Sequence, residues 1–108
     1  MIIAFNYPGT VMHNGKPVKY AIDSLRELQN NHSLILLTPS LGGFLRDEMK
    51  YLVTNGIRPW GINVNPDDNE ANYIRYDLLI DVKSVNAPVL DNGAIDWILV
   101  MKFIKKLS

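Results

Sequence analysis

The chain has 108 residues, of which 47% are hydrophobic and 20% charged, which suits one folded domain over residues 1–108 and is too short for two. Eleven basic and eleven acidic residues give a formal net charge of zero, so neither nucleic-acid binding nor attraction to an anionic membrane is expected. The same balance does little to oppose self-association and is compatible with a homodimer. The absence of cysteine excludes disulfides, zinc–thiolate sites and cysteine nucleophiles.

The first predicted element is a strand over residues 1–5, a short apolar run that stops at the turn formers of residues 6–10. Such a run is typical of a strand buried on both faces. It lacks the basic lead and the length of a signal peptide, and no apolar run approaches the roughly 18 residues of a membrane span. We therefore expect a cytoplasmic protein.

A polar loop is predicted over residues 12–17, and a helix over residues 18–31. The apolar residues that recur on one face of this helix are Ala21, Ile22, Leu25 and Leu28. Residues 34–37 form a second buried strand, which ends before Pro39 because proline cannot donate a hydrogen bond to a neighbouring strand.

The second half of the chain continues the alternation. Residues 41–55 predict a second helix that ends at an Asn-Gly pair. Short strands are predicted over residues 60–64 and 78–80, with a polar loop over residues 66–72 between them. The final helix covers residues 94–107, and the lysines in its last turns suit the negative end of the helix dipole.

Alternating strands and helices predict an α/β fold: a three-layer, Rossmann-like domain with a mainly parallel sheet, right-handed crossovers and helices on both faces. In such sheets, ligands bind outside the carboxyl ends of the strands. The residues at this edge, which we call the carboxyl rim, are Asn6, Tyr7, Pro8, Thr38 and Asp81. The sequence therefore predicts a binding site at the carboxyl rim.

The ends of the predicted strands resemble those of the haloacid-dehalogenase-like (HAD-like) phosphatases. In that family the first strand ends in D-x-D-G-T, the second ends in Ser or Thr, and a later strand follows a basic residue and ends in aspartates. The corresponding positions here are residues 6–10, Thr38 and Asp81, and residues 17–29 look like the first helix of small, capless members. The resemblance covers nearly the whole chain and implies a single HAD-like domain with an open rim.

The departures from the family pattern imply that catalysis has been lost. The family's first aspartate accepts the phosphoryl group and binds magnesium, whereas Asn6 is neutral and a poor nucleophile. The second aspartate is the general acid and base, whereas Pro8 has no group that titrates. The family's basic residue falls nearest to Tyr73, with Arg75 as its substitute, and Val82 replaces the second aspartate of the last motif.

No cofactor is expected from this residue set. A magnesium ion would keep one carboxylate, Asp81, and the main-chain carbonyl of Pro8, so its binding would be weak. Two of the candidates also have a purely structural alternative. Asp81 caps a loop if it does not bind a metal, and Asn6 satisfies a turn if it does not contact a ligand.

Donors suited to an anion remain at the rim: the amides of Gly9 and Thr10, the Thr38 hydroxyl and the helix start after Ser40. The predicted function is therefore binding without catalysis, either of a small phosphorylated or nucleotide ligand or of a protein partner. The predicted ligand-binding residues are Asn6, Tyr7, Gly9, Thr10, Thr38, Ser40 and Arg75. The alternatives are a weak magnesium-dependent phosphohydrolase that uses Asp81 and water, and an interaction module without a small ligand.

Overall fold

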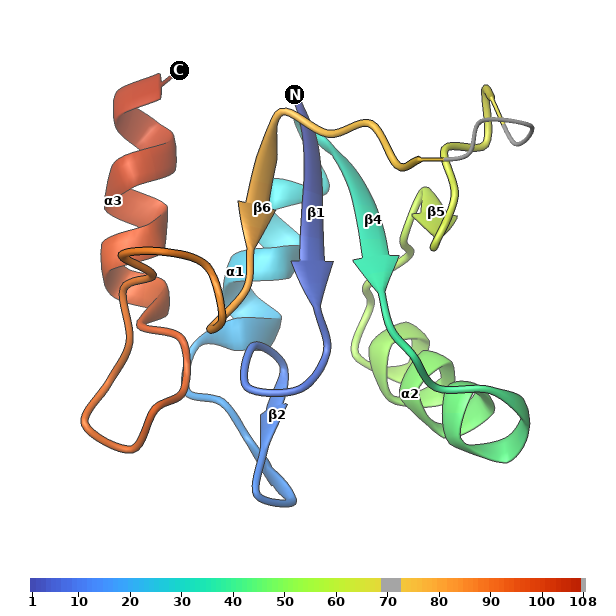
Figure 1. The fold of residues 1–108 in the computed structure, drawn as a ribbon, viewed down its shortest axis with the longest axis horizontal. Coiled ribbons are helices and arrows are strands. Elements are labelled where there is room, and N and C mark those ends of the chain that lie inside the picture. The colour runs from blue at the N-terminus through green and yellow to red at the C-terminus, as the bar shows by residue number, and fades with distance from the viewer. Residues whose placement is uncertain (69–72, 108) are drawn as a thin grey trace.

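A computed structural model describes residues 1–68 and 73–107 of the chain. Its centre is a sheet of four strands in the order β5-β4-β1-β6, and every pairing between neighbours is parallel (Figure 1). The strands are β1 (Ile2–Asn6), β4 (Ser33–Leu37), β5 (Gly61–Ile62) and β6 (Leu78–Ile80). The prediction of an α/β domain with a parallel sheet is confirmed, and the architecture is consistent with a Rossmann-like fold.

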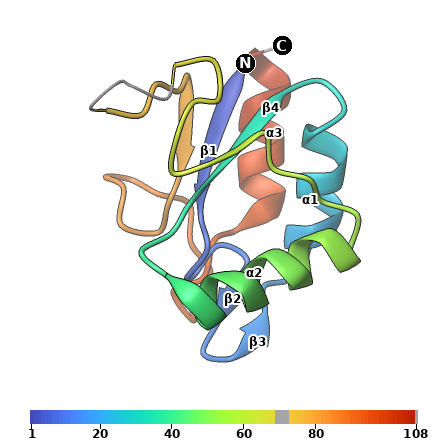
Figure 2. The same ribbon diagram turned by 90° about the vertical axis from the view of Figure 1, so that its right-hand side faces the viewer.

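The described helices are α1 (Ala21–Leu28), α2 (Gly42–Thr54) and α3 (Trp97–Leu107). Helix α1 connects β1 to β4 and α2 connects β4 to β5, and each of these strand pairs is adjacent in the sheet. Helix α3 follows β6 and packs beside α1 (Figure 2). No helix within residues 1–68 and 73–107 is both long and apolar enough to cross a membrane.

One face of the sheet, the helix face, carries the hydrophobic core. Paired residues of parallel strands point to the same face, so the register sorts the side chains into two sets. The helix-face set includes Ile3, Phe5, Leu34, Leu36 and Ile80, all buried in one cluster. All the described helices add side chains to that cluster: Ala21, Leu25 and Leu28 from α1, Leu52 from α2, and Trp97, Val100 and Ile104 from α3.

The opposite face, the loop face, is covered differently. Its central side chains, Ala4 and Ile35, are fully buried but lie outside the core cluster. The described residues between β5 and β6, 63–68 and 73–77, lie on this side of the sheet, away from α1 and α3 (Figure 2). A Cβ atom on Gly61 would come within 2.3 Å of the Val64 carbonyl oxygen, so the chain turns back directly onto β5.

The predicted helices on both faces are therefore not found in the described residues. Residues 63–68 and 73–77, which lead away from β5 and into β6, contain no helix. Their polar residues and Pro66 supply no apolar stripe that could hold a helix on the sheet. Residues 69–72 of the predicted loop lie outside the described residues.

Residues 12–17 form a small hairpin, where the sequence predicted a loop. Its strands are β2 (Met12–His13) and β3 (Lys16–Pro17), which pair antiparallel. Asn14 and Gly15 connect them with positive φ angles of 51° and 77°, as a tight hairpin turn requires. The hairpin extends the chain beyond the end of β1 and determines the shape of the loop at the carboxyl rim.

Two helices are shorter than predicted, for local reasons. Helix α1 begins only at Ala21, because Tyr20 has a left-handed backbone with φ of 66°. Helix α3 begins at Trp97 instead of residue 94. Asp96 caps it, since the Leu99 amide donates to Asp96 Oδ1 at 3.2 Å. The residue before the cap, Ile95, is held in extended structure by its pairing with Val89.

Candidate functional site

The carboxyl ends of β4, β1 and β6 lie side by side, so the rim residues do come from neighbouring strands. They divide between the two faces of the sheet. Asn6 continues the loop-face alternation of Ile2 and Ala4. Tyr7 belongs to the core cluster on the helix face. The rim residues therefore form two small groups on opposite faces of the sheet and do not line a single pocket.

The helix-face part of the rim is a hydrogen-bonded network around Glu48 of α2. The Thr38 hydroxyl donates to Glu48 Oε1 at 2.8 Å, and the Ser40 hydroxyl donates to Glu48 Oε2 at 2.5 Å. The Ser40 amide in turn donates to Thr38 Oγ1 at 3.1 Å. Bonds to a charged carboxylate are stronger than those between neutral groups, and they fix both hydroxyls.

This network corrects the prediction for Thr38 and Ser40. The Thr38 hydroxyl was expected to donate to a bound anion and Ser40 to bind the same ligand, but both hydroxyls already donate to the carboxylate of Glu48. An anion placed beside them would meet a negative charge at close range, which is unfavourable in a partly buried site. The carboxylate of Glu48 thus accepts the hydrogen bonds that the resemblance assigned to a bound phosphate.

Asn63 fixes the backbone of Thr38 from the side of β5. The Thr38 amide donates to Asn63 Oδ1 at 2.9 Å, and Asn63 Nδ2 donates to the Thr38 carbonyl at 2.8 Å. The side-chain amide thereby reproduces the two bonds that a neighbouring strand would make. Thr38, at the end of β4, is held on both its backbone and its hydroxyl.

Tyr7 lies against the same network and is buried. Burial, with smaller contributions from the charges of Glu48 and Tyr51, raises the pKa of Tyr7 to about 12. The phenol is therefore neutral at physiological pH and is poorly suited to act as a base there.

In the loop after β1, backbone amides donate hydrogen bonds to carbonyls of the same loop. The Tyr7 carbonyl accepts the amides of Thr10, Val11 and Met12 at 3.3, 3.0 and 3.3 Å, and the Gly9 amide donates to the Met12 carbonyl at 2.7 Å. The prediction that Gly9 and Thr10 offer free amides to an anion is therefore wrong. The reason is the hairpin β2–β3, which folds the chain back so that the loop closes on itself.

Gly9 is required at its position for steric reasons. Its φ is 77°, and a Cβ atom there would lie 2.9 Å from Val82 Cγ1. The Gly9 carbonyl accepts the Ile95 amide at 2.9 Å, which joins this loop to the segment before α3. Close by, the indole Nε1 of Trp97 donates to the Thr10 carbonyl at 2.8 Å. The loop is thus tied to the core from two sides.

Two buried oxygen atoms at the rim have no hydrogen-bond partner in the described part of the chain: Asn6 Oδ1 and Thr10 Oγ1. Thr10 is fully buried, and Asn6 is partly buried. Buried polar atoms usually have partners, so each unpaired atom calls for an explanation. Because Asn6 Oδ1 is itself buried, a donor from a bound molecule would reach it only after local movement of the rim.

Asp81 follows β6 and caps the next turn. The Lys83 amide donates to Asp81 Oδ1 at 3.0 Å, and the Ser84 amide donates to the Asp81 carbonyl at 3.1 Å. This is the structural alternative that the sequence left open for Asp81. Within residues 1–68 and 73–107, no group of three or more histidine, aspartate or glutamate side chains is arranged to hold a metal ion.

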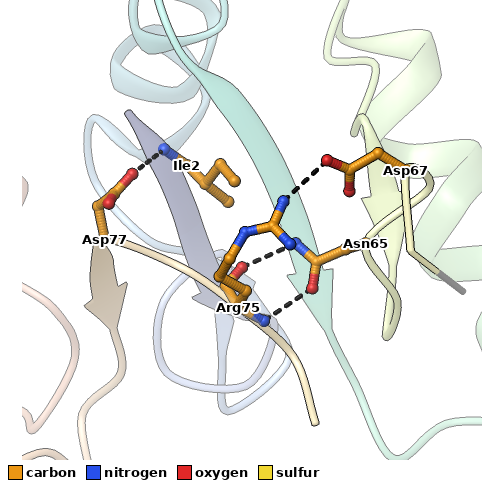
Figure 3. Close-up of polar contacts among 5 residues, drawn as sticks. All are labelled: Ile2, Asn65, Asp67, Arg75 and Asp77. Carbon is orange, nitrogen blue, oxygen red and sulfur yellow. Dashed lines mark hydrogen bonds and ion pairs between the residues drawn. The ribbon is translucent and has the colours of Figure 1, made fainter. Parts of the chain in front are cut away.

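Arg75 and Tyr73 do not lie at the carboxyl rim. The Asp77 amide donates to the Ile2 carbonyl at 2.8 Å, and the Ile2 amide donates to Asp77 Oδ2 at 2.7 Å, so residues 73–77 approach the amino end of β1 (Figures 1 and 3). Tyr73 is 76% exposed. Both residues were predicted at the site, and both lie at the opposite end of the sheet because the chain must return there before it begins the parallel strand β6.

Arg75 also has other partners. Its guanidinium pairs with Asp67 Oδ2 at 2.8 Å. Its amide donates to Asn65 Oδ1 at 2.7 Å, and its carbonyl accepts Asn65 Nδ2 at 2.8 Å (Figure 3). Asn65 is almost completely buried. Arg75 therefore helps to fasten the cover of the loop face.

Glu48 is the site residue that the sequence did not indicate. It lies on the polar side of a predicted helix, where glutamate is common and marks no function. Only the packing of α2 against the end of β4 brings it to Thr38 and Ser40.

Comparison with known proteins adds a fold but no activity. No protein-family model matches the chain, and no curated protein matches it at a significant level. A similar solved structure is the conserved protein coded by a locus from Bacteroides thetaiotaomicron, with 25% sequence identity and a TM-score of 0.83. The likeness covers 100% of this chain and 92% of that chain, so the architecture of this whole chain is shared with most of the other.

Proposed function

We propose that the chain is a HAD-like domain that no longer transfers phosphate and that acts by binding a protein partner at the carboxyl rim. The strand order β5-β4-β1-β6, with Asn6, Thr38 and Asp81 each at or directly after a strand end, supports the family assignment. The neutral Asn6 and the non-titrating Pro8 support the loss of chemistry. Acid–base assistance alone contributes roughly 10²–10⁴-fold to such reactions, and the nucleophile is absent as well.

The observation that carries the proposal is the contact between Glu48 and the hydroxyls of Thr38 and Ser40. It turns the donors expected for a phosphate into partners of an internal carboxylate. Two acceptors remain among the predicted rim residues: the carboxylate of Asp81 after β6, and Asn6 Oδ1 at the end of β1, which is buried and unpaired. Acceptors and negative charge suit a partner that brings donors, such as the lysine or arginine side chains of a protein.

A small phosphorylated or nucleotide ligand is the second candidate. Thr10 Oγ1 has no partner in the described residues, but Thr10 is fully buried, so this hydroxyl would donate to such a ligand only if the loop after β1 opened. Such a ligand would have to displace Glu48 from Thr38 and Ser40. A mutation that neutralises Glu48 should therefore increase its affinity.

A thermal-shift titration separates these readings. The wild-type protein is mixed with inorganic phosphate, nucleoside monophosphates, magnesium, or a lysine- and arginine-rich peptide. A ligand at about 100 times its Kd adds roughly 2.7 kcal/mol of stability. We expect a shift with the basic peptide and none with the phosphates. A shift with a phosphate that grows in Glu48→Gln, but not in the control Asp47→Asn on the same helix, would establish the second candidate instead.

The HAD-like assignment has its own test. Replacing Asn6→Asp together with Pro8→Asp restores both acidic positions of the family's first motif on an otherwise unchanged scaffold. We expect the double variant to gain magnesium-dependent stabilisation, with or without phosphatase turnover, and the wild type to show neither. A folded double variant that does not respond to magnesium would speak against the assignment. Magnesium-dependent turnover by the wild type, lost in Asp81→Ala, would show that the chain is an enzyme.

A further inference from the structure

Helix α3 carries an exposed apolar stripe on the side that faces the edge strand β6. Leu99, Phe103 and Leu107 follow one another at intervals of four residues, which puts them on one side of the helix. Their exposed fractions are 49%, 52% and 52%. Val85, in the loop after β6, is 91% exposed. Large apolar side chains gathered in this way usually mark an interaction surface.

The stripe borders an open cavity of about 420 Å³ between α3 and β6. Its lining is mostly apolar and includes Leu79, Val85, Ile95, Leu99 and Phe103. Strand β6 pairs with β1 on one side and with no strand of the described residues on the other. Stripe, cavity and free strand edge therefore form one continuous surface, which a partner could cover.

Charges at the two ends of the stripe indicate which partner fits. Asp96 lies three residues before Leu99, and Lys106 lies three residues after Phe103, directly before the last apolar member, Leu107. A second α3 that runs antiparallel around a two-fold axis near Met101 would bring Asp96 of each copy to Lys106 of the other. It would also bring Leu99 of each copy to Phe103 of the other. The surface is thus complementary to itself, as a two-fold interface must be.

We propose that this surface binds a second copy of the chain, with the two α3 helices antiparallel. A net charge of zero leaves little long-range repulsion between the copies. Side chains of one copy would enter the cavity of the other, and the free edge of β6 would be shielded from other strands. Asp81 also lines this cavity, but the inference uses only the apolar side chains, Asp96 and Lys106, and so does not depend on the proposed function.

The wild-type protein provides the first test. A zero-length carbodiimide cross-linker joins carboxylates to amines that are in contact. Within one molecule Asp96 and Lys106 are ten residues apart along the helix direction, or roughly 15 Å, too far for such a bond. We expect mass spectrometry to find an Asp96–Lys106 cross-link in a covalent dimer. A protein that sedimentation velocity shows to be a monomer at about 1 mM, where a contact of about −4 kcal/mol would be half formed, overturns the proposal.

Matched variants provide the second test. Phe103→Glu should raise the dimer Kd by about 30-fold or more, which corresponds to about 2 kcal/mol. Ile98→Glu is the control, because Ile98 is 50% exposed on the same helix but lines a different cavity, beside α1. Circular dichroism checks that both variants fold. If Ile98→Glu weakens the dimer as much as Phe103→Glu does, the copies associate through another face and the proposal is wrong.

Discussion

The centres of the two faces of the sheet are both fully buried, but by different means. Leu36 and Ile35 are neighbours in β4 and both are fully buried, yet Leu36 belongs to the core cluster and Ile35 does not. Helices pack apolar side chains against the first. On the side of the second lie residues 63–68 and 73–77, which the side-chain bonds of Asn65 and the ion pair of Arg75 with Asp67 hold together.

This difference separates two ways of building a protein interior. On the helix face many apolar contacts share the stabilisation, so no single polar group determines the arrangement. On the loop face a few specific bonds hold a segment that has no regular structure in its described part. We therefore expect the helix face to respond to the loss of volume and the loop face to respond to the loss of particular atoms.

The largest expected effect compares the two neighbours in β4. Leu36→Ala should lower the free energy of unfolding by about 2–5 kcal/mol, the range for deleting a fully buried leucine side chain. Ile35→Ala should cost less, because the irregular cover can move into the space and shrink the cavity. Urea denaturation of both variants measures the difference. Equal losses would show that the helices and the irregular segment are equally rigid, and that the two faces of the sheet do not differ in this respect.

The next effect concerns the contact of the loop-face segment with β5. Gly61→Ala would put a Cβ atom 2.3 Å from the Val64 carbonyl and 2.9 Å from Pro66 Cδ, so the backbone must shift. We expect a loss of about 1–3 kcal/mol, as for other overpacked sites. Gly43→Ala is the control. Nothing lies within 4 Å of its new Cβ, and alanine favours the helix, so stability should be unchanged or higher.

Removing the amide of Asn65 should have a comparable or smaller effect. Asn65→Ala leaves the amide and carbonyl of Arg75 without their partners. Because both bonds are only partly buried, the loss should fall at or below the lower end of the range of about 1–3 kcal/mol for a buried unpaired group. Hydrogen exchange of the Arg75 amide should speed up, while that of Leu36 should not. Faster exchange at both positions would mean that the loop-face cover and the core open as one unit.

The ion pair between Arg75 and Asp67 should contribute least. Its side chains are 48% and 55% exposed, so Asp67→Asn should cost no more than about 1 kcal/mol. That small loss should shrink further in high salt, because salt screens exposed charges. Thermal unfolding at low and high ionic strength checks both statements. A large loss that does not depend on salt would give the pair a structural role beyond electrostatics.

The sequence predicted the elements that make the helix face. Continuous apolar runs marked β1, β4 and β6, and the spacing of Leu25 and Leu28 marked the buried side of α1. These features depend on patterns of many residues, which tertiary contacts rarely override. The hairpin β2–β3 was missed although Asn14-Gly15 is a typical hairpin turn, because its strands are only two residues long and polar.

The candidate site was less predictable, because it depends on individual side chains. Asn6, Tyr7, Thr38 and Asp81 do lie at or directly after the strand ends, as strand order requires. Glu48, which accepts hydrogen bonds from the hydroxyls of Thr38 and Ser40, left no pattern in the sequence. The position of Arg75 at the other end of the sheet, in contrast, follows from the predicted parallel pairing of β6. The HAD-like resemblance and the binding function remain predictions that the experiments above test.

The two tryptophans lie in different parts of the molecule, so their intrinsic fluorescence can report on the core and on the edge of the sheet separately. Trp97 is 1% exposed in the core beneath α3, and its indole nitrogen is bonded to the Thr10 carbonyl, whereas Trp60, directly before β5, is 37% exposed. Iodide in solution should quench the fluorescence of Trp60 and leave that of Trp97 nearly unchanged. Trp60→Phe and Trp97→Phe would then give single-tryptophan proteins in which the edge of the sheet and the core report their unfolding separately.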